Sequence, residues 1–222
     1  MFDALKRLIG SSPGASSGDE GQVLASWAKA EGHAFKRVNA KTGSGYVVET
    51  REGWRVEWGG SQRSYIPGKE LRFRCDTGLP SDVQMILVSK VQAQILETDV
   101  FSRFTNAMQT QIDHSLPDEM RWLAMHPRVS LSDRPALTRR FVLLSNAEAV
   151  ARRWLDESVL AALEEAAGTW WTDTLMLVLT LNRGMLTLRM PGQTLEPAQL
   201  KMVGQLYGVM AQRLLAMGRS EG

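Results

Sequence analysis

Residues 46–58 read YVVETREGWRVEW, and this stretch decides the fold class. Two runs rich in β-branched and aromatic residues flank a short loop that ends at Gly53. A glycine at the third loop position is typical of a type I turn closed by a left-handed residue. Side chains alternate between the two faces of a strand, so Trp54, Val56 and Trp58 should be buried and Arg55 exposed. The stretch therefore predicts an antiparallel hairpin with one apolar face.

A second hairpin of similar design is expected at residues 175–190. Leucine recurs at every second position from Leu175 to Leu181, and residues 182–184 read NRG, again a loop that ends in glycine. The intervening residues are also largely apolar, which indicates a central strand. The returning strand should carry Arg189 outward.

Helical spacing of apolar residues predicts helices over 20–30, 89–112, 117–126, 146–166 and 197–217. Asn146 is a suitable N-cap for the fourth of these, and Gly218 a suitable stop after the last. Strands are predicted at 71–75 and 141–144. The apolar run 83–88 fits either a buried strand or the start of a helix. The order helix–strands–helices–strand–helix–hairpin–helix predicts an α+β protein with helices packed on antiparallel sheet.

The composition is that of an ordinary globular protein with a well-mixed surface. The 222 residues carry 26 basic and 24 acidic side chains, and a net charge of +2 argues against a dedicated polyanion binder. Cys75, the only cysteine, lies in phase with Leu71 and Phe73, which predicts a core thiol. No apolar run approaches the roughly 20 residues that span a bilayer. We expect a cytoplasmic protein with one globular region over 20–222 and a sub-boundary near 127–138.

The N-terminal residues 1–19 are expected to stand apart from this globular region. Four apolar residues fall at helical spacing within Met1–Gly10, namely Phe2, Leu5, Leu8 and Ile9. Residues 11–18 are rich in Gly, Ser and Pro and predict a flexible linker. The sequence therefore predicts a short amphipathic helix that docks on a neighbour, a protein partner or an anionic membrane surface.

The last predicted helix carries a narrow apolar seam at alternating spacings of three and four: Leu200, Val203, Tyr207, Met210, Leu214 and Met217. Beside it run Gly204, Gly208 and Ala211. A glycine inside a helix costs about 1 kcal/mol relative to alanine, so two of them need a packing explanation. One reading is close contact with another helix across a homodimer. The other is that the seam covers the protein's own sheet, with the glycines accommodating a bulky residue such as Trp170 or Trp171.

A basic sheet face is the next candidate surface. Arg55, Arg72 and Arg74 should project from outward positions of neighbouring strands, as a phosphate-binding surface requires. However, the alternation directs Trp54 to the opposite face, and Glu57 dilutes the positive charge. We therefore expect cross-strand ion pairs here, with nucleic-acid binding as the alternative.

The sequence offers little support for catalysis. His114 and His126 lie near carboxylates and are the candidates for a metal-assisted enzyme, but no close His-to-His helical spacing is present. No phosphate-binding loop or dinucleotide fingerprint occurs, and no cofactor is expected. The reading favoured by the sequence is a non-enzymatic interaction or accessory protein, dimeric or associated peripherally with a membrane.

Overall fold

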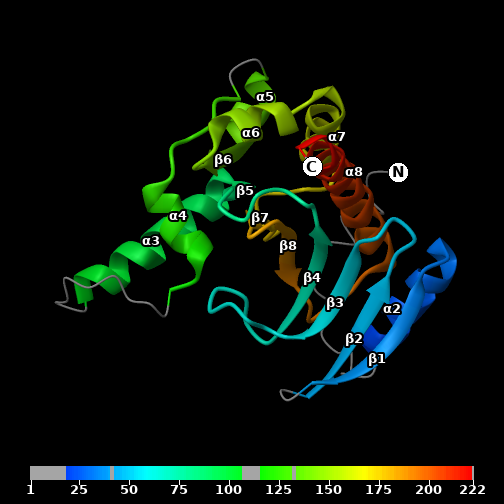
Figure 1. Ribbon diagram of the computed structural model, residues 1–222. Coiled ribbons are helices and arrows are strands. Elements are labelled where there is room, and N and C mark those ends of the chain that lie inside the picture. The colour runs from blue at the N-terminus through cyan, green and yellow to red at the C-terminus, as the bar shows by residue number, and fades with distance from the viewer. Residues whose placement is uncertain (1–18, 41–42, 107–115, 132–133, 222) are drawn as a thin grey trace.

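The computed structural model describes residues 19–40, 43–106, 116–131 and 134–221. Met1–Gly10 and His114 lie outside these ranges, so the predictions that rest on them are not tested by the structure. In the described ranges, one eight-stranded sheet carries helices on both faces (Figure 1). This architecture confirms the α+β class and the predicted order of elements.

The sheet is antiparallel in every neighbouring pair, in the order β1-β2-β3-β4-β8-β7-β5-β6. Its strands are β1 (Ala34–Ala40), β2 (Gly43–Glu49), β3 (Arg55–Gly60), β4 (Lys69–Asp76), β5 (Met85–Ser89), β6 (Phe141–Ser145), β7 (Val178–Asn182) and β8 (Met185–Pro191). The apolar run at 83–88 is thus largely strand, and all five residues of β5 are buried. Strand β6 follows the expected sub-boundary near 127–138, yet it pairs with β5, so the sheet continues across that region.

Both hairpins form at the predicted positions. Strands β2 and β3 pair with Val48 opposite Val56, and Gly53 has φ +86° in the connecting turn. Glycine adopts this left-handed conformation without the steric cost that other residues incur. Trp54, Val56 and Trp58 are buried while Arg55 is exposed, which confirms the predicted register. Strands β7 and β8 form the second hairpin, although β7 begins at residue 178 and not at 175.

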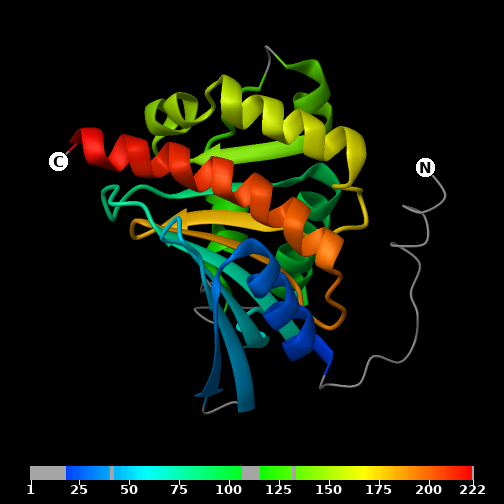
Figure 2. The same cartoon turned by 90° about the vertical axis from the view of Figure 1, so that its right-hand side faces the viewer.

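The helices are α2 (Asp19–Glu31), α3 (Lys90–Asn106), α4 (Asp118–Met125), α5 (Pro135–Arg140), α6 (Glu148–Trp154), α7 (Glu157–Thr169) and α8 (Pro197–Glu221). Figure 2 shows α8 lying across one face of the sheet, between α2 and α7. The larger apolar core lies under these helices, and a smaller one lies under α3 and α4 on the opposite face. None of the helices in the described ranges combines the length and apolar character needed to cross a bilayer.

Two helix predictions need correction. The helix expected over 146–166 is divided into α6 and α7, because Asp156 starts a new helix by accepting a hydrogen bond from the backbone N–H of Val159. Asn146 is not an N-cap: its side chain instead accepts from the N–H of Gln84 and donates to the carbonyl of Asp82. Helix α8 continues past its expected stop, so Gly218 lies inside it.

Candidate functional site

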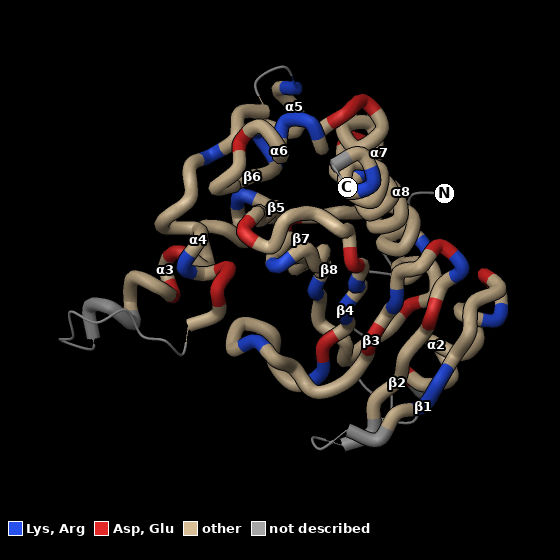
Figure 3. Tube along the Cα trace, viewed as in Figure 1, with Lys and Arg blue, Asp and Glu red and all other residues tan. Residues whose placement is uncertain are grey.

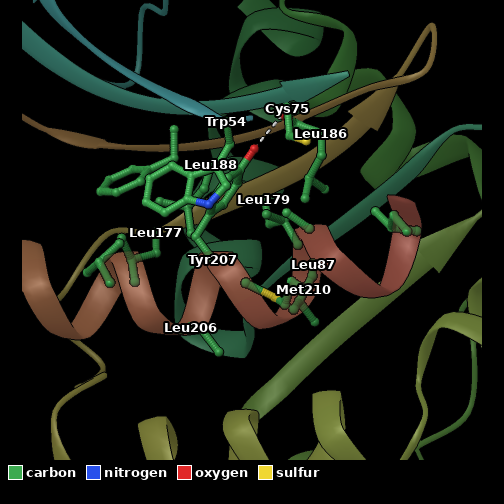
Figure 4. Close-up of a cluster of buried hydrophobic side chains, with 14 of the residues drawn as sticks. Trp54, Cys75, Leu87, Leu177, Leu179, Leu186, Leu188, Leu206, Tyr207 and Met210 are labelled. Atoms are coloured by element: carbon green, nitrogen blue, oxygen red, sulfur yellow. Dashed lines mark hydrogen bonds between the residues drawn. The ribbon is translucent and has the colours of Figure 1, made fainter. Parts of the chain in front are cut away.

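The apolar seam of α8 faces the chain's own core. Its six members are all buried: Leu200, Val203, Tyr207, Met210, Leu214 and Met217. Figure 4 shows Tyr207 and Met210 among leucines of the sheet, and the Tyr207 hydroxyl donates a 2.9 Å hydrogen bond to the carbonyl oxygen of Leu186. Ala211 is also fully buried in this core. Of the two readings that the sequence left open for the seam, the structure has the one in which it covers the chain's own sheet.

The two glycines beside the seam have different surroundings. A Cβ atom at Gly204 would lie 3.5 Å from the Trp27 ring and 3.7 Å from the Trp54 ring, so this position packs directly against two indoles. The sequence pointed to the tryptophans at 170–171 for that place, and they are not the residues found there. A Cβ atom at Gly208 would meet no described atom within 4 Å. Gly208 therefore leaves open space beside the helix.

This space is a groove of about 330 Å³ between α2, the turn that joins β2 to β3, and α8. We call it the α2–α8 groove. It is lined by Trp27 and Glu31 of α2, by His33 between α2 and β1, and by Glu52 and Trp54 of the turn. Helix α8 contributes Lys201, Gly204, Gln205, Gly208, Val209 and Gln212. Its size falls at the lower end of the range typical of ligand pockets.

Three ring nitrogens at the groove lack hydrogen-bond partners among the described residues: Trp27 Nε1, Trp54 Nε1 and His33 Nδ1. Both indoles are more than nine-tenths buried. The His33 ring meets both of them edge-on, with ring centroids 5.5 Å from Trp27 and 6.1 Å from Trp54. A buried donor without a partner costs about 1–3 kcal/mol, and most buried polar groups in proteins are paired. An indole nitrogen can only donate, so a molecule bound here would have to supply acceptor atoms.

Charged and amide side chains surround these aromatic rings. Glu31, Glu52 and Lys201 are exposed at the rim, and Gln205 and Gln212 add amide groups on the α8 side. The guanidinium of Arg51 lies against Gly32 at the outer edge, close enough that a Cβ atom on Gly32 would be 2.8 Å from Arg51 Nη2. The groove thus has an aromatic interior, a glycine floor and a rim of mixed charge.

The predicted basic face is present, but its charges are paired. Glu57 binds all three of its arginines: Glu57 Oε1 lies 2.7 Å from Arg55 Nε and 3.3 Å from Arg74 Nη1, and Oε2 lies 3.2 Å from Arg72 Nε. Figure 3 shows acidic and basic positions interspersed along β3 and β4. Cross-strand ion pairing is the arrangement that we expected, although one carboxylate shared by three guanidiniums leaves part of their positive charge uncompensated.

The ion pairs on this face extend into a buried cluster that the sequence did not predict. Arg189, which we expected outward, is only 7 % exposed, and its guanidinium pairs with Glu70, which is fully buried. Arg72 Nη1 also lies 3.4 Å from Glu70, and the backbone N–H of Gln62 donates to it at 2.8 Å. The loop after β3 contacts this cluster through Gln62, and alternation along β8 carries no information about such a contact.

A second buried carboxylate, Glu119, binds the loop that follows β3. Glu119 of α4 is 2 % exposed and binds the guanidinium of Arg63, and it accepts a 2.6 Å hydrogen bond from the Tyr65 hydroxyl. Burial, followed by the charge of Glu119, raises the pKa of Tyr65 above its ordinary value. These contacts join the 61–68 loop to α4. We interpret them as a structural connection, since every one of these groups is paired within the protein.

His126 is the described member of the pair proposed for a metal site. Its Nε2 atom forms a 2.9 Å hydrogen bond with Gln84 Oε1, and its ring stacks on Trp122 with centroids 5.6 Å apart. Within the described ranges, no three side chains of the His, Cys, Asp and Glu types gather where they could hold a metal ion. His126 is thus held by a hydrogen bond and a ring contact at the end of α4, and the metal site, which also needs His114, stays a prediction.

Sequence reasoning found Gly204 and Gly208 but missed Trp27, His33 and Trp54 as their partners across the groove. These rings come from a helix end, a strand start and a turn, and only tertiary packing brings them together. The sequence feature that pointed to the groove was the pair of glycines four residues apart in the last predicted helix.

No protein-family model and no curated protein matches the chain. Among solved structures, the chain is similar to the mycobacterial trehalose monomycolate transport factor A, TtfA, at 13 % sequence identity and a TM-score of 0.47. The alignment covers 88 % of this chain and 94 % of that one. A likeness of this size carries no conclusion about function.

Proposed function

We propose that this protein is a non-enzymatic accessory protein of the cytoplasm that binds a peptide segment in the α2–α8 groove. The observation that carries the proposal is that the groove beside Gly208 is lined by two tryptophans whose buried indole nitrogens have no hydrogen-bond partner among the described residues. Each indole N–H group needs a hydrogen-bond acceptor, and Gly208 leaves space for a ligand that carries one.

A peptide segment meets these requirements better than an isolated ion or an apolar molecule. Its backbone carbonyls are strong acceptors for the indole N–H groups, and its N–H groups match the amide oxygens of Gln205 and Gln212. Its side chains can lie on the aromatic rings of Trp27 and Trp54, while charged side chains pair with the mixed rim. Shallow grooves that combine apolar contacts with a few directed hydrogen bonds are typical of peptide recognition.

A homodimer remains a separate proposal. Tyr207 and Ala211, two of the residues suggested for its interface, are occupied in the core, so the surface of α8 available to a second copy is the side that carries Gly208 and Gln205. The mass in solution, measured by light scattering, tests this directly. A monomeric mass at all concentrations would end the dimer proposal without affecting peptide binding.

Site-specific photo-cross-linking tests the proposed function. A benzophenone amino acid replaces Gln205 at the groove or, as a control, Gln94, which is exposed on α3 on the opposite side of the sheet. After irradiation in cells of the native host, we expect a discrete adduct with a protein partner from position 205 and none of the same mass from position 94.

A pair of matched variants makes this result specific. Gly208→Leu fills the groove and should abolish the adduct. Gly168→Leu is the control, because Gly168 also lies in a helix with no atom within 4 Å of an added Cβ atom. An adduct that survives Gly208→Leu, or one that is equally strong at position 94, would contradict the proposal. Because leucine favours helix over glycine, neither variant should unfold the protein.

A further inference from the structure

The chain itself contains a segment with the chemistry that the groove requires. Residues 1–10 combine an apolar stripe, formed by Phe2, Leu5, Leu8 and Ile9, with the cations Lys6 and Arg7. Building on the function proposed above, we infer that this N-terminal segment occupies the α2–α8 groove of its own chain and that a partner must displace it.

The connection is long enough for this contact. Residues 11–18 join the segment to Asp19, and eight residues span up to about 28 Å when fully extended. Helix α2 leads from Asp19 towards the groove, which is lined by Trp27 and Glu31 in its C-terminal half. At 1.5 Å per residue, these two positions lie about 12 and 18 Å along the helix from Asp19. The linker therefore reaches the groove with length to spare.

The charges and hydrogen-bonding groups are complementary. Glu31 and Glu52 stand at the rim opposite the cations that Lys6 and Arg7 would bring. The backbone carbonyl groups of residues 1–10 would supply the acceptors that the Trp27 and Trp54 indole nitrogens lack.

The main competing surface is the outer face of α3, where Val91 is 41 % and Ile95 is 55 % exposed. Both carboxylates of α3 are engaged: Glu97 lies 3.6 Å from Arg128, with which it forms an ion pair, and Asp99 also has an interaction partner. The polar neighbours Gln94 and Thr98 are uncharged. This face therefore offers the segment apolar contact without a free partner for its cations, whereas the groove offers both.

Engineered disulfides in the full-length chain test the inference. Leu8→Cys is combined either with Gln205→Cys at the groove or with Gln94→Cys on the outer face of α3; both second positions are exposed. The native Cys75 is 2 % exposed, and burial raises the pKa of its thiol, so it should not exchange. Under mild oxidation, we expect an intramolecular disulfide at position 205 that forms at least tenfold faster than at position 94.

Two further results decide the matter. Gly208→Leu in the 8/205 pair should reduce the rate to that of the 8/94 pair, whereas Gly168→Leu should leave it unchanged. Equal rates for the two pairs, a faster rate at position 94, or a product of dimer mass would each overturn the inference, the last because it assigns the segment to a second copy.

The two tests fail independently. If no disulfide forms at the groove but the photo-adduct at position 205 persists, the inference is wrong and the proposed function stands. If the disulfide forms rapidly but no partner adduct is seen even with Phe2→Ser and Leu5→Ser to release the segment, the groove is an internal docking site and the proposed function is wrong.

Discussion

The two faces of strands β3, β4 and β8 bury different chemistry in adjacent rows. In one row Val56, Phe73 and Leu188 stand side by side across the three strands and pack under α2 and α8. In the next row, Glu57 stands opposite Arg72, which in turn stands opposite Arg189. The apolar row depends on shape alone, whereas each charge in the other row depends on a particular partner. A defect in the second row should therefore cost more than one of equal size in the first.

Glu70 is where this difference is sharpest. Like charges directly opposite each other on neighbouring strands are destabilising, and Arg72 and Arg189 form such a pair. Glu70 lies between them, with one carboxylate oxygen paired with each guanidinium. Glu70→Gln would remove the carboxylate that pairs with buried Arg189 and leave Arg72 with Glu57 alone. We expect the free energy of unfolding to fall by about 3–5 kcal/mol, as when one partner of a buried ion pair is removed.

Urea denaturation of the variant and wild type measures this loss. The control is Glu49→Gln, which removes an exposed ion pair with Lys36, where the side chains are 49 % and 58 % exposed. That change should cost less than about 1 kcal/mol. If the two variants lose similar amounts, the charged row is no more demanding than an ordinary surface, and the contrast between the faces is wrong.

The apolar row was predictable from the sequence and the charged row was not, for a physical reason. Alternation and the turn at Gly53 are local, so the burial of Trp54 and the exposure of Arg55 follow from a few consecutive residues. The burial of Arg72 and Arg189 goes with contacts to Glu70 and to the loop after β3, which come from outside their immediate sequence neighbours. Alternation reports which face a side chain is on and not whether that face is covered.

In the α2–α8 groove, too, some residues could be predicted from the sequence and others could not. The glycines of α8 were visible because a helical glycine is anomalous wherever it occurs. Their partners were not, because Trp27 and Trp54 are separated by 26 intervening residues and meet only when α2 folds back on the sheet. The apolar seam of α8 could be predicted from the sequence, but its partner could not, because the spacing is the same whether a helix packs on its own sheet or on another chain.

Gly218 offers the next test, at the end of α8 far from the groove. A Cβ atom there would overlap the carbonyl oxygen of Thr77. A backbone atom cannot move aside as a flexible side chain does, so Gly218→Ala forces the helix end away from the loop after β4. We expect a loss of about 1–3 kcal/mol, typical of overpacking, measured by urea denaturation. An unchanged urea midpoint would show that the end of α8 can move away from Thr77 without loss of stability. The apolar face of the sheet would then tolerate an added methyl group at this position.

Gly208→Ala should have a smaller effect of opposite sign. An added methyl group meets no described atom within 4 Å, and alanine favours helix over glycine by about 1 kcal/mol. In a chain that also carries Phe2→Ser and Leu5→Ser, which release the N-terminal segment, the melting temperature should therefore rise by roughly 2–4 °C in a thermal scan. In the otherwise wild-type chain the rise should be smaller or absent, because the inferred segment already lies beside Gly208. An equal rise in both backgrounds would show that the space beside Gly208 is empty.

The smallest expected effect is a pH dependence on the side of the sheet that carries α4. Burial lowers the pKa of the His126 imidazole below its ordinary value of 6.5. The unfolded chain therefore takes up this proton more readily than the folded protein does. The stability that neutral His126 contributes is complete above about pH 6.5 and decreases as the pH falls through 6.5 towards the lower folded-state pKa.

His126→Phe retains a ring to stack on Trp122 but cannot titrate. The difference in unfolding free energy between wild type and this variant, measured from pH 8 to pH 5, should decrease as the pH falls. A constant difference would mean that His126 is as accessible to protons as in the unfolded chain, and that its contact with Gln84 does not hold the neutral ring.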